Sequence, residues 1–203
     1  MSRLLLVRHG NTKLNNAKRF WGQTDVELST DGIRQAEKLR ERLSAEKIDA
    51  AYSSTLSRTQ LTAEIIASIH KLGVTALTEL MEINFGFIEG LTFEEVSHLH
   101  PEIADVMSKW AIKPKFPGGE SLENLDKRVQ KFLKVLQKHK PEETILIVAH
   151  AGTLRLMICN LMGIGPEHWR HIQLDLASLS ILETYPQGAV LSLLNDVSHL
   201  KIQ

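Results

Sequence analysis

LLLVRHGNT, the stretch from Leu4 to Thr12, decides how this sequence is interpreted. It begins with four apolar residues, which predict a short strand buried inside a sheet. Arg8 and His9 follow directly, and Gly10 comes next. In sheets of parallel strands flanked by helices, binding sites form at the carboxyl ends of the strands. The stretch therefore predicts a functional site at the point where this strand ends.

A second apolar run, far along the chain, ends in the same way. ILIVAHAG, residues 145–152, places His150 directly after a predicted buried strand. If the two strands are parallel neighbours, His9 and His150 lie together at one edge of the sheet. The glycine that follows each histidine lets the backbone bend and approach a ligand closely.

Two arginines lie near the same predicted edge. Arg8 precedes His9, and Arg58 begins a predicted helix that follows the strand pattern AAYSS, residues 50–54. Guanidinium groups bind phosphate oxygens, and the N-terminus of a helix favours anions. We therefore predict a compact positive pocket of the size of a phosphate group.

A histidine in such a pocket suits nucleophilic attack on phosphorus. A neutral imidazole forms a phosphohistidine that water later opens, while arginines neutralise the phosphate oxygens. The leaving alcohol needs a proton, and LMEINFGFIEG, residues 80–90, offers Glu82, with Glu89 as a second candidate. A carboxylic acid beside a bound phosphate dianion keeps its proton near neutral pH. One histidine at a strand end is more often structural, so the prediction depends on the pair together with both arginines.

The remaining chain alternates between strand and helix patterns. Strands are predicted over residues 3–9, 48–54, 74–80, 143–152, 176–184 and 189–196, the last two joined by a Pro-Gln-Gly turn. Helices are predicted over residues 28–49, 57–73, 118–140 and 153–163. This alternation predicts an α/β fold with helices on both faces of a mostly parallel sheet and one antiparallel strand. Residues 81–117 break the pattern and are expected to form an inserted, partly helical region over one edge.

Local signals mark where the predicted helices begin and end. Ser29 or Thr30 is expected to cap the first helix. The apolar stripe of that helix is expected to contain Ile33, Ala36, Leu39 and Leu43. In the second helix, Ser57 and Gln60 form a capping pattern, and Gly73 is the expected stop.

The composition narrows the classes of partner. The chain has 203 residues, which suits one domain, and its formal net charge is zero, which favours neither nucleic acid nor an anionic membrane. Cys159 is the only cysteine, so no intrachain disulfide forms, and we expect it to be a small buried residue. No stretch reaches membrane-spanning length and no signal-peptide pattern is found, so a cytoplasmic location is the default expectation.

We predict that two further histidine pairs do not bind metal. His98 and His100 flank one residue, and His168 and His171 are one helical turn apart. Neither pair occurs in a typical metal-ligand pattern. We predict no metal and no cofactor.

Several motifs occur in a fixed order along nearly the whole chain. They are LLLVRHGNT, LSTDGIRQA, SSTLSRTQLTA, LMEINFGFIEG, PGGES and ILIVAHAGTLR. With these motifs the sequence resembles the histidine phosphatase (phosphoglycerate mutase-like) superfamily. The resemblance implies one three-layer α/β/α domain over residues 1–203 that needs no metal. It also implies that His9 is the phosphorylated nucleophile, that Glu82 is the proton donor, and that phosphate is bound by Arg8, Asn15, Arg58 and His150.

The sequence departs from the superfamily pattern at a few positions. Asn11 stands where many members have glutamate, and Leu61 where many have glutamine. Ala151 replaces the first glycine of the commoner HGG motif. None of these changes removes a reacting group, and Ala151 still offers its backbone N–H.

Hydrolysis is favoured over the mutase reaction. Cofactor-dependent phosphoglycerate mutases are longer, with insertions that cover the site and add basic residues for a carboxylate. Here the region 81–117 is short, and its basic residues other than histidine are Lys109, Lys113 and Lys115. We therefore predict a phosphomonoesterase whose partner is a small phosphorylated metabolite, and we allow for a homodimer.

The substrate prediction depends on two further stretches. A length near 200 residues and FPGGES, residues 116–121, are similar to the α-ribazole-5'-phosphate phosphatase branch of cobalamin biosynthesis, although broad-specificity phosphatases share the motif. In RFWGQTD, residues 19–25, Trp21 or Phe20 is a candidate for stacking on a planar base, or for anchoring its own loop. The residues predicted to bind substrate are Gly10, Thr12, Asn15, Trp21, Gln23 and Ala151. The alternatives are a broad-specificity acid or sugar phosphatase, a phosphoglycerate mutase, and a non-catalytic module that binds a phosphorylated ligand.

Overall fold

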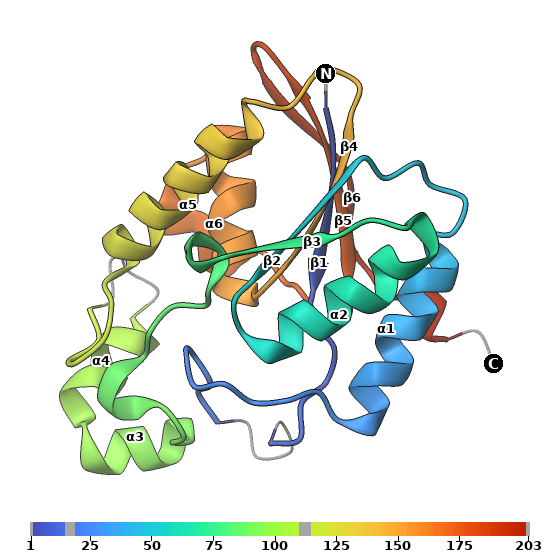
Figure 1. The fold of residues 1–203 in the computed structure, drawn as a ribbon. Helices are drawn as coiled ribbons and strands as arrows, with labels where there is room; N and C mark the ends of the chain where they lie inside the picture. Colours follow the sequence, from blue (N-terminus) through green and yellow to red (C-terminus); the bar gives the residue numbers. More distant parts are fainter. Residues whose placement is uncertain (1, 15–18, 110–114, 202–203) are drawn as a thin grey trace.

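A twisted sheet forms the centre of the computed structural model, which describes residues 2–14, 19–109 and 115–201 (Figure 1). Within these ranges the strands are β1 (Arg3–Arg8), β2 (Ala50–Ser54), β3 (Val74–Leu77), β4 (Thr144–Ala149), β5 (Leu179–Tyr185) and β6 (Gly188–Asp196). Their order in the sheet is β3-β2-β4-β1-β5-β6. The pairings from β3 to β1 are parallel, and β5 is antiparallel to both of its neighbours. The predicted mostly parallel sheet with one antiparallel strand is confirmed.

Helices cover both faces of the sheet, which confirms the three-layer prediction (Figure 1). The α-helices are α1 (Thr30–Arg42), α2 (Ser57–Ala67), α3 (Phe93–Leu99), α4 (Pro101–Ser108), α5 (Leu122–Leu136) and α6 (Ala151–Met162). The short 3-10 helices are η2 (Ser68–His70), η3 (Thr78–Leu80), η4 (Gly86–Ile88), η5 (Pro166–His171) and η6 (Ser198–Leu200). Helices α1 and α2 pack on one face of the sheet, and α5 and α6 pack on the other.

The apolar run of β1 is continuous because both of its faces are buried. Leu4 and Leu6 point into the core beneath α5 and α6, whereas Leu5 and Val7 point into the core beneath α1 and α2. Alternate side chains of a strand face opposite sides, so a strand between two helical layers needs apolar residues at every position.

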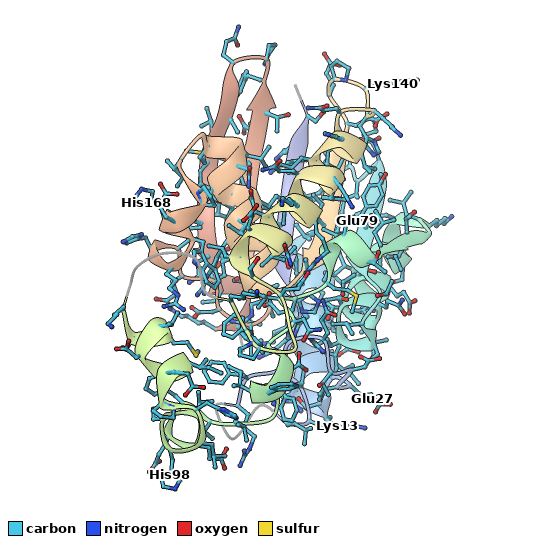
Figure 2. The ribbon with its side chains drawn as sticks, turned by 90° about the vertical axis from the view of Figure 1, so that its left-hand side faces the viewer. Lys13, Glu27, Glu79, His98, Lys140 and His168 are labelled. Atoms are coloured by element: carbon cyan, nitrogen blue, oxygen red, sulfur yellow. The ribbon has the colours of Figure 1, made fainter. Side chains whose placement is uncertain are left out.

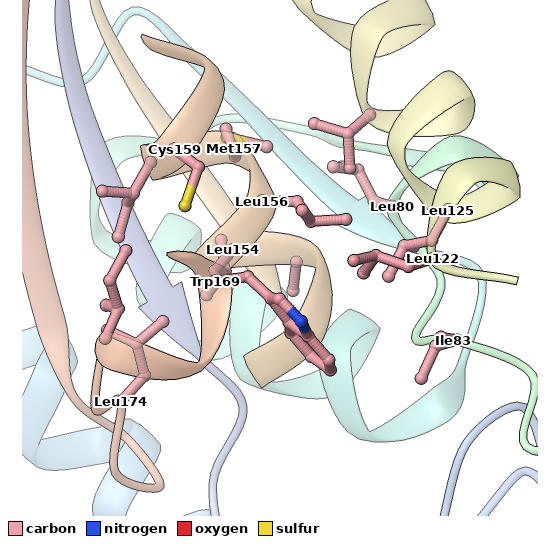
Figure 3. Packing of buried hydrophobic residues seen from close by; sticks show 14 of the residues in the cluster. Leu80, Ile83, Leu122, Leu125, Leu154, Leu156, Met157, Cys159, Trp169 and Leu174 are labelled. Atoms are coloured by element: carbon pink, nitrogen blue, oxygen red, sulfur yellow. The ribbon is translucent and has the colours of Figure 1, made fainter. Parts of the chain in front are cut away.

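Figure 3 shows the core on the α6 side of the sheet. Leu154, Leu156 and Met157 from α6 pack in one cluster with Leu122 and Leu125 from α5. Cys159 is fully buried in this cluster, as predicted, and burial raises the pKa of its thiol to about 11. The thiol is therefore part of the packing.

The start of α1 follows the sequence signals. Ser29 is its N-cap, and the Ser29 hydroxyl accepts a hydrogen bond from the backbone N–H of Gly32 at 3.0 Å. Leu39 is fully buried as expected, but Ile33 is 37% exposed. The apolar stripe therefore begins at Ala36, one turn later than predicted.

Both end signals predicted for α2 are wrong. Its N-cap is Leu56, and Ser57 instead bonds through its backbone N–H and hydroxyl to the carboxylate of Asp25. At the other end, Lys71 takes the left-handed conformation with a φ of 55°, two residues before the glycine expected to stop the helix. The tertiary contact with Asp25 and the intervening 3-10 turn explain both differences.

The chain between β3 and α5 carries η3, η4, α3 and α4. These two α-helices lie beyond the end of the sheet toward which β1 runs (Figure 1). The region predicted as an insertion, residues 81–117, is thus partly helical over its described part, while its status as an insertion stays a prediction. In the parts of the chain that the structure describes, no helix combines the length and apolar character needed to cross a membrane.

Candidate active site

The two histidines lie side by side at the carboxyl edge of the sheet. Strands β1 and β4 pair in parallel with Arg8 opposite Ala149, so His9 and His150 leave adjacent strands at the same level. Their ring centroids are 5.1 Å apart and the ring planes meet at 61°. The parallel register therefore produces the juxtaposition that the two strand ends predicted.

The ring of His9 is buried and has a defined tautomer. Its Nδ1 lies 2.8 Å from the carbonyl oxygen of Gly10, which can only accept, so Nδ1 carries the proton and Nε2 keeps its lone pair. Burial and then the positive charges of Arg58 and Arg8 hold the pKa of His9 well below that of a free imidazole. A neutral ring with an unprotonated Nε2 is the form that attacks phosphorus.

Two buried guanidinium groups supply positive charge. Arg58, in the first turn of α2, is 2% exposed and donates to the carbonyl oxygens of Gly22 at 2.7 Å and Thr24 at 2.9 Å. Arg8 donates to the carbonyl oxygen of Leu174 at 2.7 Å, and its buried Nε has no hydrogen-bond partner in the described residues. Burial lowers the pKa of both groups. An anion placed between them would provide the missing partner of Arg8 Nε.

His150 is the N-cap residue of α6 and is fully buried. Its Nε2 lies 2.8 Å from the Ser54 hydroxyl, which lies 2.6 Å from the hydroxyl of Thr59. Its Nδ1 is buried without a partner among the described residues. Burial, followed by the charge of Arg58, holds the pKa of His150 well below its usual value.

Glu82 faces the histidines from the segment that follows η3. One carboxylate oxygen accepts from the backbone N–H of Ile83 at 2.9 Å, and the other accepts from that of Gly152 at 3.0 Å. A Cβ on Gly152 would lie 2.4 Å from Glu82 Oε1, so a larger residue at this position would require the Glu82 carboxylate to move. The close approach expected here for a ligand is therefore made to Glu82.

The second carboxylate candidate has a different position. Glu89 accepts from the backbone N–H groups of Gln23 and Thr24, both at 2.8 Å, and from that of Phe85 at 3.2 Å. It does not line the cavity that contains His9. Glu89 therefore shapes the loop, and Glu82 remains the candidate acid.

Some of these groups line a small cavity of about 70 Å³. It is lined by Arg8, His9, Thr12, Arg19, Trp21, Val26, Arg58 and Glu82. The nucleophile, the cations and the carboxyl group thus surround one space that suits a phosphate group.

Comparison with known proteins identifies the family. Residues 4–197 match the model of the histidine phosphatase superfamily, branch 1. The chain belongs to this superfamily. Phosphoserine phosphatase 1 of Hydrogenobacter thermophilus is 36% identical over 98% of this chain and 95% of its own length. The adenosylcobalamin/α-ribazole phosphatase of Escherichia coli is 32% identical over 96% of both chains.

A solved structure agrees with these relatives. The α-ribazole phosphatase of Shigella flexneri superposes with a TM-score of 0.88 at 30% identity, over 96% of both chains. The family and its phosphatase relatives make this histidine phosphatase a phosphoric monoester hydrolase. The names of the relatives from Hydrogenobacter thermophilus and Escherichia coli point to different substrates.

The residues predicted to bind substrate are dispersed in this histidine phosphatase. Thr12 and Trp21 line the small cavity, and Ala151 lines a neighbouring one. Gln23 lines neither cavity, because its side-chain amide donates to the carbonyl oxygen of Glu82 at 3.1 Å. Asn15 lies outside the described residues.

Glycine is needed at position 10 for a structural reason. A Cβ at this position would lie 2.6 Å from the carbonyl oxygen of Gly32 in α1. The close contact that requires glycine is therefore between two backbones, whereas the predicted close contact was with a ligand.

Sequence reasoning missed two residues that hold the Glu82 segment in place. Arg128, on the polar side of α5, forms a two-pronged ion pair with Glu120 at 2.7 and 2.8 Å. It also donates to the carbonyl oxygens of Met81 at 3.0 Å and Glu82 at 3.1 Å. The hydroxyl of Thr153 donates to the carbonyl oxygen of Met81 at 2.7 Å. A lone arginine on an amphipathic helix gives no sequence signal for such a role.

The two histidine pairs lie away from this site. His98 projects outward from α3, and His168 lies on a different part of the surface (Figure 2). Over the described ranges, no three His, Cys, Asp or Glu side chains are arranged to hold a metal ion.

Proposed function

We propose that this protein hydrolyses small phosphomonoesters through a covalent phosphohistidine at His9. The single observation that carries the proposal is the state of the His9 ring. Its Nδ1 proton is committed to the Gly10 carbonyl, so Nε2 is left as a nucleophile in a cavity lined by Arg8, Arg58 and Glu82.

The first half of the reaction transfers the phosphoryl group. The lone pair of His9 Nε2 forms the N–P bond while the bond between phosphorus and the alcohol oxygen breaks. The carboxylic acid of Glu82 gives its proton to the leaving alkoxide. Arg8, Arg58 and His150 surround the oxygens that carry the charge, and this positioning supplies most of the rate enhancement.

The second half regenerates the enzyme. The Glu82 carboxylate takes a proton from water as the water oxygen attacks phosphorus. The N–P bond breaks, its electron pair returns to Nε2, and inorganic phosphate leaves. The net reaction is ester plus water to alcohol plus phosphate.

A labelling experiment tests this proposal. Enzyme mixed with a ³²P-labelled ester and quenched within milliseconds should carry label that is stable in alkali and lost in acid, on a peptide containing His9. The His9→Ala variant should carry none and should lose turnover while its circular dichroism spectrum is unchanged. Binding of phosphate without label or turnover would instead support the non-catalytic module.

Two phosphate esters, which differ in their alcohol part, are candidates for the substrate. The α-ribazole-5'-phosphate prediction is supported by the likeness to the α-ribazole phosphatases and by Trp21, which lines the cavities where a planar base would stack. A carboxylate-bearing ester such as phosphoserine is favoured by arginines beside the site. Release of inorganic phosphate from each ester and from 3-phosphoglycerate ranks them, and formation of 2-phosphoglycerate would indicate the mutase alternative. The cytoplasmic location and the homodimer stay predictions.

A further inference from the structure

A larger cavity of about 370 Å³ opens beside the catalytic cavity. The two share the lining residues Arg8, Arg19, Trp21 and Glu82. A molecule whose phosphate lies at His9 therefore extends directly into the larger space. Its apolar walls come from Phe20, Phe85, Met107, Phe116 and Trp169.

This larger cavity is strongly positive, although the chain as a whole has no net charge. Four of the described residues that line it are arginines, namely Arg8, Arg19, Arg155 and Arg170. The only carboxylate among those lining residues is Glu82, and it is already bonded to two backbone N–H groups. The arginine side chains therefore concentrate positive charge in the larger cavity.

Two of the arginines have roles already. Arg8 belongs to the phosphate pocket, and Arg19 forms an ion pair with Glu95 at 2.6 Å and donates to the carbonyl oxygen of Gly90. Among the described residues that line the cavity, Arg155 and Arg170 are therefore the two arginines whose positive charge still lacks a counter-charge.

Arg155 lies in α6, one turn after Ala151, and both line the cavity. Its Nε is buried and has no hydrogen-bond partner in the part of the chain that the structure describes. The acidic groups that act on its charge are Glu82 and Asp175, and Asp175 is engaged by the side-chain amides of Gln173 and Asn195. A buried donor without an acceptor is unfavourable, so this arrangement suits an acceptor from outside the chain.

Arg170, in η5, faces the same space. Its guanidinium lies over the ring of Trp169 at 5.4 Å and donates to the carbonyl oxygen of Met107 at 2.6 Å. Burial lowers the pKa of Arg170, and the charge of Arg155 lowers it further, so the two cations lie close enough to repel. An anion between them would remove that repulsion.

We infer that Arg155 and Arg170 form a second anion subsite, and that the substrate is a phosphomonoester whose alcohol part carries a carboxylate or a second phosphate. This inference rests on the proposed function and specifies the alcohol at the same site. Guanidinium forks match both kinds of anion, and the aromatic walls cover the carbon chain between the two charges. The two arginines come from α6 and η5, outside the region 81–117.

A matched pair of substrates tests the inference. 3-Phosphoglycerate and glycerol 3-phosphate differ in one group, a carboxylate against a hydroxymethyl. The wild-type enzyme should prefer the first in kcat/KM by about tenfold or more, because a site built for a charged group discriminates against an analogue without it. A parallel comparison of fructose 1,6-bisphosphate with fructose 6-phosphate tells whether a second phosphate serves as well as a carboxylate.

Substitutions of Arg155 and Arg170 test whether these two residues cause the preference for 3-phosphoglycerate. Arg155→Met and Arg170→Met should each raise KM for 3-phosphoglycerate by about tenfold while changing glycerol 3-phosphate by less than about twofold, because the lost contact binds only the carboxylate. Arg34→Met removes the same charge from the exposed face of α1 and should change neither substrate. If Arg155→Met does not fold, Arg155→Lys keeps the charge, loses the fork and gives the same comparison.

Two results would overturn the subsite. One is equal kcat/KM for the two substrates in the wild type, and the other is a parallel loss for both in the Arg155 and Arg170 variants. Hydrolysis of p-nitrophenyl phosphate separates this failure from that of the proposed function. If this ester is hydrolysed with labelling of His9, the proposed function holds even though the subsite fails. If no ester is hydrolysed, the proposed function itself fails.

Discussion

His150 Nε2 lies 2.8 Å from the hydroxyl oxygen of Ser54, and both side chains are fully buried. The same hydroxyl lies 2.6 Å from that of Thr59 and accepts from the backbone N–H of Leu56 at 3.2 Å. When the Ser54 hydroxyl donates to Nε2, the proton of His150 resides on Nδ1, which has no partner in the described structure and is free to donate to phosphate. Ser54 is therefore a positioning residue for His150.

Removing that hydroxyl should weaken phosphate binding. Ser54→Ala is expected to lower kcat/KM about tenfold and to raise the inhibition constant of inorganic phosphate, because His150 Nε2 loses its hydrogen-bond partner. Ser54→Thr keeps a hydroxyl and should recover most of the loss. Ser53→Ala is the matched control, since its buried hydroxyl donates to the carbonyl oxygen of Ser54 and does not contact His150. Equal effects of the two alanine variants would contradict this role.

Variants of Glu82 and Glu89 should differ in how their kcat/KM depends on the leaving group. Glu82→Gln is expected to slow alkyl phosphates about a hundredfold or more, and to slow p-nitrophenyl phosphate far less, because nitrophenolate leaves without a proton. Glu89→Gln should affect all esters alike, since Glu89 bonds to the backbone of the loop at Gln23 and Thr24. The measurement is kcat/KM against leaving-group pKa. An unchanged slope in Glu82→Gln would rule this residue out as the acid.

Acid should destabilise the fold through the two buried histidines. Burial, then Arg58, holds the pKa of His9 and of His150 below the unfolded value of about 6.5, so below that pH the unfolded chain binds more protons than the folded one. The free energy of unfolding should therefore fall as the pH decreases from about 6.5, by up to about 1.4 kcal/mol per pH unit for each histidine.

Urea unfolding at a series of pH values checks this expectation. His150→Gln should flatten the dependence, because the glutamine does not titrate. His98→Gln, which changes a residue on the surface of α3, should leave the dependence as it is. Stability that stays constant or increases on acidification would show that these rings are not held neutral.

Metal removal should leave activity unchanged. Arg8 and Arg58 line the cavity around the phosphate position and supply its positive charge. Turnover of an aryl phosphate is expected to be the same before and after dialysis against EDTA. A large loss that added Mg²⁺ or Zn²⁺ restores would replace this mechanism with a metal-assisted one.

The edge that carries the site was predictable because few arrangements bury two apolar runs such as those ending at His9 and His150. Both need cover on two faces, and adjacent parallel strands provide it. Arg58 was predictable for a related reason, since a strand that leads straight into a helix places the first turn at the same edge.

Contacts between distant segments were not predictable from local pattern. The capping pattern at Ser57 fails because Asp25, far away in sequence, binds that residue instead. Ser54 and Arg155 lie in motifs that carry the family resemblance, but neither was assigned a role, because a serine in a strand and an arginine in a helix are ordinary until their neighbours are known. The glycine at position 152 predicted a close approach to a ligand, whereas its close neighbour is the carboxylate of Glu82.

The larger cavity takes most of its walls from outside the sheet, whereas His9 and His150 follow β1 and β4 directly. Several walls of the larger cavity, including Phe85, Met107 and Arg170, thus come from other segments of the chain than the two histidines. A library that varies Phe85, Met107 and Arg170 samples new alcohols without touching the atoms that react. The scaffold is therefore suited to directed evolution, in which the reaction is kept and the set of accepted substrates is changed.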